Sequence, residues 1–213
     1  MSLRRIPESP TLGMMYRVIE MKSRGIEVYS LAPGEPYFPT PPEIVEAAHR
    51  AMLEGRTHYV EALGTREVRE AIARKVNRIN GIRADAEETA FMPSKYALAA
   101  VFQAILSRGG EVLVPDPGYF YSEPVILAGG RPVRYRLAED FSLDLDEIRR
   151  KVGGRTRAIV VNSPANPTAK VFRRGELEEL YEFARDRGLR IVSDEAYEDI
   201  IFEGRHFSPG SLE

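Results

Sequence analysis

Polar and aromatic side chains follow four predicted buried strands, each at the carboxyl end of its strand. These side chains belong to Ser94, Lys95, Tyr119, Asn166, Asp194 and Tyr197. Ligands of an open parallel sheet bind at the carboxyl ends of its strands. The sequence therefore predicts a binding site built from these strand ends.

Each of these residues has a chemical use and a plainer structural one. Free amide groups at the helix start near Ser94 suit a phosphate, and an ordinary strand-to-helix turn explains them equally. Tyr119 can cover a planar ligand or simply pack. The carboxylate of Asp194 is costly at a buried strand end unless a cation meets it. Its plainer roles are a helix cap or a structural ion pair.

Strands and helices alternate after Gly81, and these elements must position the residues. Strands are predicted at TAFMPS, EVLVPDPG, PVRYRL, RAIVVNSP and LRIVSDEAY. Helices are predicted at residues 96–109, 144–152 with Asp144 as N-cap, and 175–188. The alternation predicts an α/β fold with a mostly parallel sheet covered by helices.

The first 80 residues do not show this alternation of strands and helices. Apolar residues at helical spacing predict helices at residues 10–25, 43–54 and 65–80. The stretch IEVYSL, residues 26–31, is predicted as a strand that runs into a loop rich in proline and glycine.

Composition excludes several classes of function. The chain has 213 residues, 43% apolar and 29% charged, with a net charge of −2, so nothing attracts nucleic acid or an anionic membrane. The absence of cysteine excludes disulfides and thiolate metal sites, and three scattered histidines argue against a histidine metal site. No signal peptide and no apolar run of about 20 residues is present, so we expect a cytoplasmic protein.

Four motifs occur in a set order: APGEPYFPTPPEI, HYVEALGTREVREAIA, NSPANPTA and SDEAYEDI. The last two place Asn166 and Asp194 28 residues apart (194 − 166) and are the most specific. In sequence and order the motifs resemble those of the fold-type I, pyridoxal-phosphate-dependent aminotransferases of class I/II, the aspartate aminotransferase group. The resemblance covers residues 10–210, nearly the whole chain.

The resemblance implies pyridoxal 5'-phosphate as cofactor and transfer of an amino group between an amino acid and a 2-oxo acid. By the same resemblance, Asn166 and Tyr197 hydrogen-bond the phenolic oxygen of the cofactor, and Asp194 keeps the ring nitrogen protonated. Tyr119 stacks on the ring. Such a ring withdraws electrons from the α-carbon of the substrate.

Further roles follow from the family for the remaining positions. The backbone amides of Ser94 and Lys95 would hold the phosphate. Gly34 would approach the substrate carboxylate, because it has no side chain. Tyr59 would reach the phosphate of the neighbouring subunit, since the family's sites lie at a dimer interface.

The sequence also departs from the family. Pro93 removes an amide donor from the phosphate loop, and Ala169 replaces a glycine where a Cβ disfavours a positive φ. The family's catalytic lysine lies beyond Glu213, so the catalytic residue is unknown. We therefore expect an arm or small-domain segment at residues 1–41 and an incomplete large domain at 42–213.

This incompleteness has consequences for the sheet and for activity. We expect TAFMPS to lack a partner strand and LRIVSDE to form an open apolar edge. We expect the chain alone to be a weak or inactive transaminase. As partners we expect a second copy of the chain, in a homodimer, or a complementing C-terminal chain. The alternatives are a non-catalytic cofactor- or partner-binding remnant, and a pyridoxal-phosphate-dependent carbon–sulfur lyase or synthase.

Overall fold

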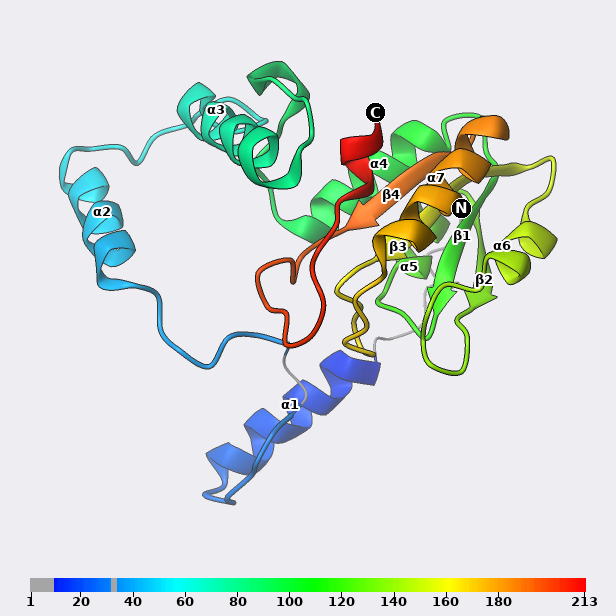
Figure 1. Cartoon of the computed structure of the whole chain (residues 1–213). Helices are drawn as coiled ribbons and strands as arrows, with labels where there is room; N and C mark the ends of the chain where they lie inside the picture. Colours follow the sequence, from blue (N-terminus) through cyan, green and yellow to red (C-terminus); the bar gives the residue numbers. More distant parts are fainter. Residues whose placement is uncertain (1–9, 32–33) are drawn as a thin grey trace. The chain divides into compact units, whose positions relative to one another are not determined.

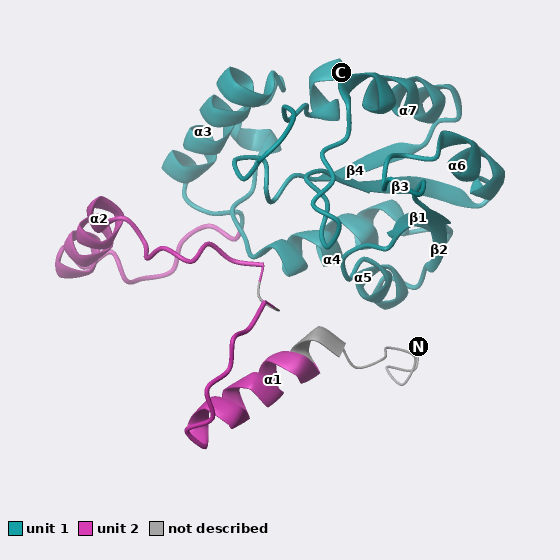
Figure 2. Ribbon diagram, turned by 60° about the horizontal axis from the view of Figure 1, so that its bottom comes forward, with its two compact units in different colours: residues 1–5, 63–213 teal, residues 6–62 magenta. Residues whose placement is uncertain are grey.

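The computed structural model describes residues 10–31 and 34–213. The described residues from Leu63 onward form one compact unit, and those up to Ala62 form a second (Figure 2). The predicted domain boundary after residue 41 stays a prediction.

The larger unit is built on a four-stranded parallel sheet (Figure 1). Its strands are β1 (Glu111–Asp116), β2 (Arg131–Arg136), β3 (Thr156–Asn162) and β4 (Arg190–Asp194), and their order is β2-β1-β3-β4. Helices lie between consecutive strands, as parallel pairing requires. The predicted fold class is confirmed.

Helices cover both faces of this sheet. They are α4 (Ser94–Ile105) and α5 (Ser122–Leu127) on one face, and α6 (Leu145–Lys151) and α7 (Arg174–Asp186) on the other. Successive strand residues point to opposite faces. Leu113 of β1 therefore packs with Ile148 of α6 and Leu180 of α7, whereas Val112 packs with Phe102 of α4. Burial on both faces explains why the central strands β1 and β3 are largely apolar, whereas the outer strand β2 carries three arginines.

The other helices agree with their predicted places. They are α1 (Pro10–Ser23), α2 (Pro42–Leu53) and α3 (Arg66–Lys75), which a π-helical turn continues at Val76–Asn80. Two 3-10 turns lie at Ala86–Glu88 and Pro209–Leu212. The predicted cap of α6 is confirmed, because a carboxylate oxygen of Asp144 accepts a hydrogen bond from the amide of Glu147 (2.8 Å).

Two segments predicted as strands are not strands in the structure. Residues 26–31 and 89–93 have no β-pairing, and Ser94 already begins α4. A strand needs a hydrogen-bonded neighbour, and the amide of Phe91 instead donates to the carbonyl of Leu63 in a connection (2.8 Å). Because TAFMPS forms no strand, the expectation that it lacks a partner strand stays a prediction. β4 is an outer strand of the described sheet, as expected.

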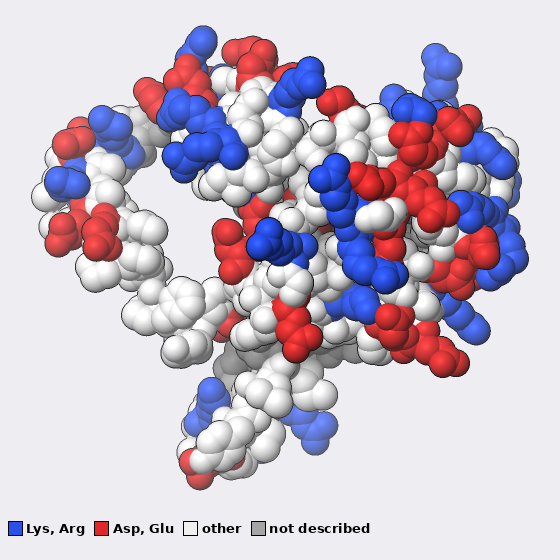
Figure 3. Space-filling view, in the orientation of Figure 1, with Lys and Arg blue, Asp and Glu red and all other residues white. Residues whose placement is uncertain are grey.

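Acidic and basic side chains intermingle over the face of the molecule in Figure 3. Many are paired within one helix, as Arg174 and Glu178 are on α7 (2.6 Å). Such exposed pairs stabilise a fold only slightly. In the described part of the chain, no helix has the length and apolar character needed to cross a membrane.

An ion cluster around one buried carboxylate joins the amino ends of three strands. The side chain of Glu111, 8% exposed, begins β1, and one of its oxygens accepts hydrogen bonds from Arg131 (2.7 Å) and Arg155 (3.0 Å). Arg131 begins β2, and Arg155 directly precedes β3. The hydrogen bond from Arg131 is the main cause that lowers the pKa of Glu111, although burial opposes it.

We predict that Glu111→Gln lowers the free energy of unfolding by about 1–2 kcal/mol at neutral pH, because charged hydrogen bonds to partly exposed arginines are lost. The lowered pKa means that the carboxylate stabilises the fold above its ordinary pKa of 4.5, and that this contribution is lost as the pH falls through the lower folded value. Urea unfolding should thus show a smaller loss of stability on acidification in the variant. Glu178→Gln, at an exposed pair, should change stability by less than about 0.5 kcal/mol. Equal effects of the two substitutions would contradict the assignment.

Candidate active site

The carboxyl ends of β3 and β4 are tied to each other by Asn162. Asn162 and Asp194 are register partners in the parallel pair. The side chain of Asn162, a residue only 3% exposed, donates to the backbone carbonyl of Asp194 (3.0 Å) and to that of Pro164 (3.2 Å). Its oxygen accepts a hydrogen bond from the amide of Asn166 (2.7 Å). One buried side chain therefore fixes both Asp194 and the loop that carries Asn166.

The carboxylate of Asp194 is held by neutral donors. One oxygen accepts a hydrogen bond from the hydroxyl of Tyr121 (2.7 Å), and the other accepts one from the amide of Ala196 (3.1 Å). Asp194 itself is half-buried. Among the described residues it forms no ion pair, which makes it the site's uncompensated charge.

Tyr121 joins this carboxylate to the loop that follows β1, a strand that β3 separates from β4. It follows β1 in the connection to α5, and its side chain is fully buried beside Val114 and Val160. Burial, followed by the charge of Asp194, raises the pKa of Tyr121 far above its ordinary value. The phenol therefore stays protonated and acts as a donor to Asp194.

Aromatic rings surround this contact. The ring of Tyr119 lies edge-on to that of Tyr121, with centroids 5.7 Å apart. The ammonium group of Lys95 lies 5.9 Å from the Tyr119 ring centroid and 5.5 Å from that of Phe120. The first turn of α4 is thus beside the loop that follows β1, as the prediction of a common site requires.

The first amide groups of α4 have no hydrogen-bond partner within residues 10–31 and 34–213. Ser94 and Lys95 are its first two residues, and no earlier helical turn offers them carbonyls. The carbonyl of Pro93 accepts from the amides of Tyr96 (2.9 Å) and Ala97 (3.1 Å). A helix start of this kind attracts an anion.

The loop after β3 presents the Asn166 side chain. Asn166 is half-buried, and within the described part of the chain its side-chain amide makes no hydrogen bond. Ala169 adopts a positive φ of 56°, although its Cβ disfavours one, and its amide donates to the carbonyl of Ala165 (2.7 Å). Tyr197 is half-buried in the turn that follows Asp194.

Two predicted residues lie in the other compact unit. Gly34 stands in the loop between α1 and α2, and Tyr59 is fully exposed after α2. Their roles toward the substrate and the neighbouring subunit stay predictions.

Sequence reasoning missed Tyr121 and Asn162. Tyr121 is the last aromatic residue of YFY, and only the fold distinguishes it from Tyr119. A signal for Asn162 was available, because a polar residue that ends the run AIVV must satisfy its buried amide locally.

The donor set fits one kind of ligand. An ionised acid without a cation suits a protonated ring nitrogen, and the free amide of Asn166 suits a ring oxygen. Tyr119 offers an aromatic surface, and α4 offers amides for an anionic group. These residues therefore fit a flat ring that has a protonated nitrogen, a hydrogen-bond acceptor and an anionic group.

Known proteins share this sequence and fold. The profile of the family described as aminotransferase class I and II matches residues 26–210. A probable aspartate/prephenate aminotransferase of Thermus aquaticus is 43% identical over 96% of this chain and 54% of its own length. The arginine–pyruvate transaminase of Pseudomonas aeruginosa is 37% identical over 92% of this chain and 51% of its own length.

Solved structures agree with these relatives. The aspartate aminotransferase from Thermus thermophilus with maleate has a TM-score of 0.95 and 40% identity, over 100% of this chain and 57% of that one. The chain thus spans about half the length of the relatives it matches, and its parallel sheet is that of the fold-type I enzymes. The chain belongs to the class I and II aminotransferases, whose cofactor is pyridoxal phosphate.

Proposed function

We propose that this chain forms the cofactor-binding part of an enzyme that transfers an amino group between an amino acid and a 2-oxo acid. The observation that carries the proposal is Asp194, an acid at a buried strand end that neutral donors orient and no described cation neutralises. Its free lone pairs are suited to hold a proton on the ring nitrogen of pyridoxal phosphate. When bound, the protonated cofactor withdraws electrons from the α-carbon of the substrate.

The phenolic side of the cofactor would be held by Asn166 and Tyr197. The Asn166 amide is fixed through its backbone by Asn162, so little conformational entropy is lost when its side chain donates to the phenolic oxygen. Tyr197 follows Asp194 by three residues and would hydrogen-bond the same oxygen. Tyr119 would lie against the ring.

The phosphate would bind at the start of α4. Backbone amides of Ser94 and Lys95 would donate to it. The ammonium group of Lys95 in the first turn is repelled by the positive end of the helix dipole. A bound phosphate dianion would attract both the ammonium group and the helix start. Tyr59 would contribute to the phosphate site of a neighbouring subunit, and Gly34 would admit the substrate carboxylate.

The substrates and assembly belong to the same proposal. Relatives that match 96% and 92% of this chain act, by name, on aspartate and prephenate or on arginine and pyruvate, respectively. We therefore propose an amino acid and a 2-oxo acid as substrate classes. The protein would act in the cytoplasm as a homodimer.

We predict that Asp194→Asn weakens the binding of pyridoxal phosphate by about tenfold to a hundredfold, because a charge-assisted hydrogen bond is replaced by a neutral one. Equilibrium dialysis followed by absorbance of the cofactor gives the dissociation constant. Asp199→Asn, at an exposed position of the same turn, serves as the matched control and should bind as the unmodified chain does. Identical affinities for the two variants would refute the role of Asp194.

We also predict that Tyr121→Phe weakens cofactor binding by about fivefold, because Asp194 loses the donor that orients it. Tyr135→Phe is a matched control: its hydroxyl is equally buried but donates to the carbonyl of Val160 (2.8 Å), within the core. That variant should lose stability without losing affinity. If both substitutions weakened binding alike, the effect would come from general loosening of the core.

A further inference from the structure

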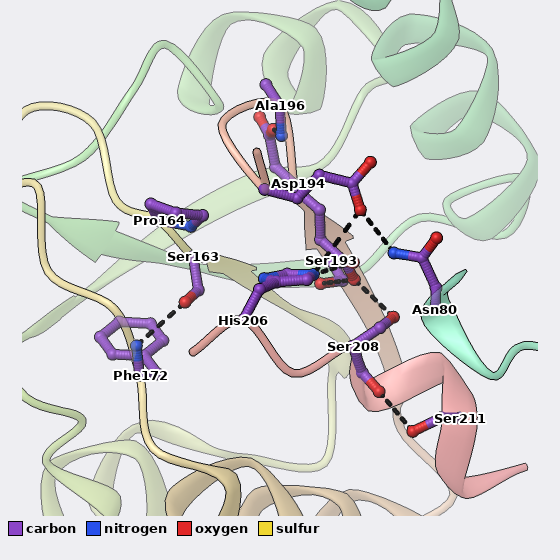
Figure 4. A network of polar contacts seen from close by, with 12 residues as sticks. Asn80, Ser163, Pro164, Phe172, Ser193, Asp194, Ala196, His206, Ser208 and Ser211 are labelled. Carbon is purple, nitrogen blue, oxygen red and sulfur yellow. Dashed lines mark hydrogen bonds and ion pairs between the residues drawn. The ribbon is translucent and has the colours of Figure 1, made fainter. Parts of the chain in front are cut away.

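A second polar cluster lies on the other side of the strand end that carries Asp194. We call it the latch, and its members are Lys75, Asn80, Ser193, Glu195, Glu198, His206 and Ser208. They come from three segments of the larger unit: the end of α3 with its π-helical turn, the end of β4 with the turn after it, and the approach to the last 3-10 turn. Figure 4 shows Asn80, His206 and Ser208 converging beside Ser193.

Glu195 is the centre of the latch. One carboxylate oxygen accepts hydrogen bonds from the hydroxyls of Ser193 (2.7 Å) and Ser208 (2.8 Å), and the other lies 2.7 Å from Nε2 of His206. The side chains of Glu195 and His206 are only 16% and 13% exposed. Nδ1 of His206 is buried without a hydrogen-bond partner among the described residues, so Nε2 alone orients the ring.

Glu198 fastens the other end of the same turn. Its carboxylate, 19% exposed, pairs with Lys75 and accepts a hydrogen bond from Asn80, and it lies 3.9 Å from His206. Burial alone would raise the pKa of Glu198, but the hydrogen bonds from Lys75 and Asn80 lower it below its ordinary value. Glu198 therefore remains ionised and holds the turn against α3.

A metal ion is a poor explanation of these residues. Ligand atoms of Glu195, Glu198 and His206 lie within 4.8 Å of one another, a spacing that metal sites also show. The ammonium of Lys75 already supplies the positive charge, and two serine hydroxyls donate to Glu195. The two carboxylates of the cluster therefore have partners without an added ion.

The latch encloses the two residues of the turn that the cofactor would need. Side chains of successive extended residues point to opposite sides, so Asp194 faces Tyr121 while Ser193 and Glu195 bond on the other side. The amide of Glu198 donates to the carbonyl of Glu195 (3.0 Å), which closes the turn around Tyr197. Fixing Glu195 and Glu198 therefore fixes the backbone that carries Asp194 and Tyr197.

We propose that Glu195 and Glu198 are positioning residues, which clamp the turn at residues 194–198 so that Asp194 and Tyr197 meet the cofactor in one geometry. This inference rests on the proposed function. Among the described residues, the carboxylate of Asp194 hydrogen-bonds Tyr121 and Ala196 and neither of these glutamates, so both would act through the backbone. A double-mutant cycle separates such an effect from a general loss of stability.

The test compares Glu195→Gln in the unmodified chain and in Asp194→Asn, with the dissociation constant of pyridoxal phosphate as readout. We expect Glu195→Gln to weaken binding about tenfold in the unmodified chain and less than about threefold in the Asp194→Asn chain. In the latter chain residue 194 no longer carries a charge, so a shift in its position matters less. Glu203→Gln, in the exposed connection after the turn, is the matched control and should leave affinity unchanged. The same factor in both backgrounds, or no change in either, would overturn the proposal.

Ser208→Ala is a less disruptive substitution that tests the proposal if the Glu195→Gln chain does not fold. Ser208→Ala removes one of the hydrogen bonds to Glu195 and leaves the ion pairs in place. It should weaken binding by about threefold and show the same non-additivity with Asp194→Asn. Unchanged affinity in a folded Ser208→Ala chain would also overturn the proposal in that case.

The two proposals fail in distinguishable ways. Asp194→Asn without effect on affinity, or an unmodified chain that does not bind the cofactor, would defeat the proposed function. A normal effect of Asp194→Asn together with no effect of Glu195→Gln would defeat only the latch.

Discussion

The hydrogen bonds of one buried amide, that of Asn162, hold the functional edge of this molecule together. They join the ends of two neighbouring parallel strands and fix the backbone of the loop beyond the first. Leaving any of these buried groups unpaired costs about 1–3 kcal/mol, so the loop and the strand end cannot separate cheaply. Asn166 and Asp194 keep their mutual position for that reason, although 28 residues (194 − 166) separate them in the chain.

The two ends of the sheet use charge in opposite ways. At the amino ends, Glu111 is neutralised by two arginines, and the cluster serves stability. At the carboxyl ends, Asp194 has only neutral donors among the described residues, while the neighbouring Glu195 and Glu198 are fully engaged by the latch. Asp194 forms no ion pair among the described residues, whereas Glu198 of the same turn pairs with Lys75, so Asp194 is the acid suited to a cationic ligand.

Much of the fold could be read from the sequence, because apolar runs, glycines and caps act locally. The runs AIVV and RIV became β3 and β4, and Asp144 caps α6 as its spacing indicated. Residues 26–31 and 89–93 have strand-like composition but form no strand, since pairing depends on a neighbour that composition does not reveal. Ala169 adopts a positive φ that its Cβ disfavours, because the loop around it is fixed by other contacts.

The site was predictable in part for the same reason. Asp194, Asn166 and Tyr119 could be singled out because they follow predicted strands, and the family resemblance predicted their roles. Tyr121 and Asn162 were missed because their partners come from other strands, and only the sheet order brings them together. The latch depends on contacts between residues more than 100 positions apart, such as Lys75 and Glu198, which no local pattern encodes.

The state of the cofactor's ring nitrogen tests the central claim most directly. Nitrogen-15 magnetic resonance of ring-labelled pyridoxal phosphate, bound to the chain at neutral pH, distinguishes a protonated from an unprotonated pyridine nitrogen. An ionised Asp194 that faces this atom predicts the protonated resonance, and predicts its loss in Asp194→Asn. An unprotonated resonance in the unmodified chain, unchanged by that substitution, would contradict the claim.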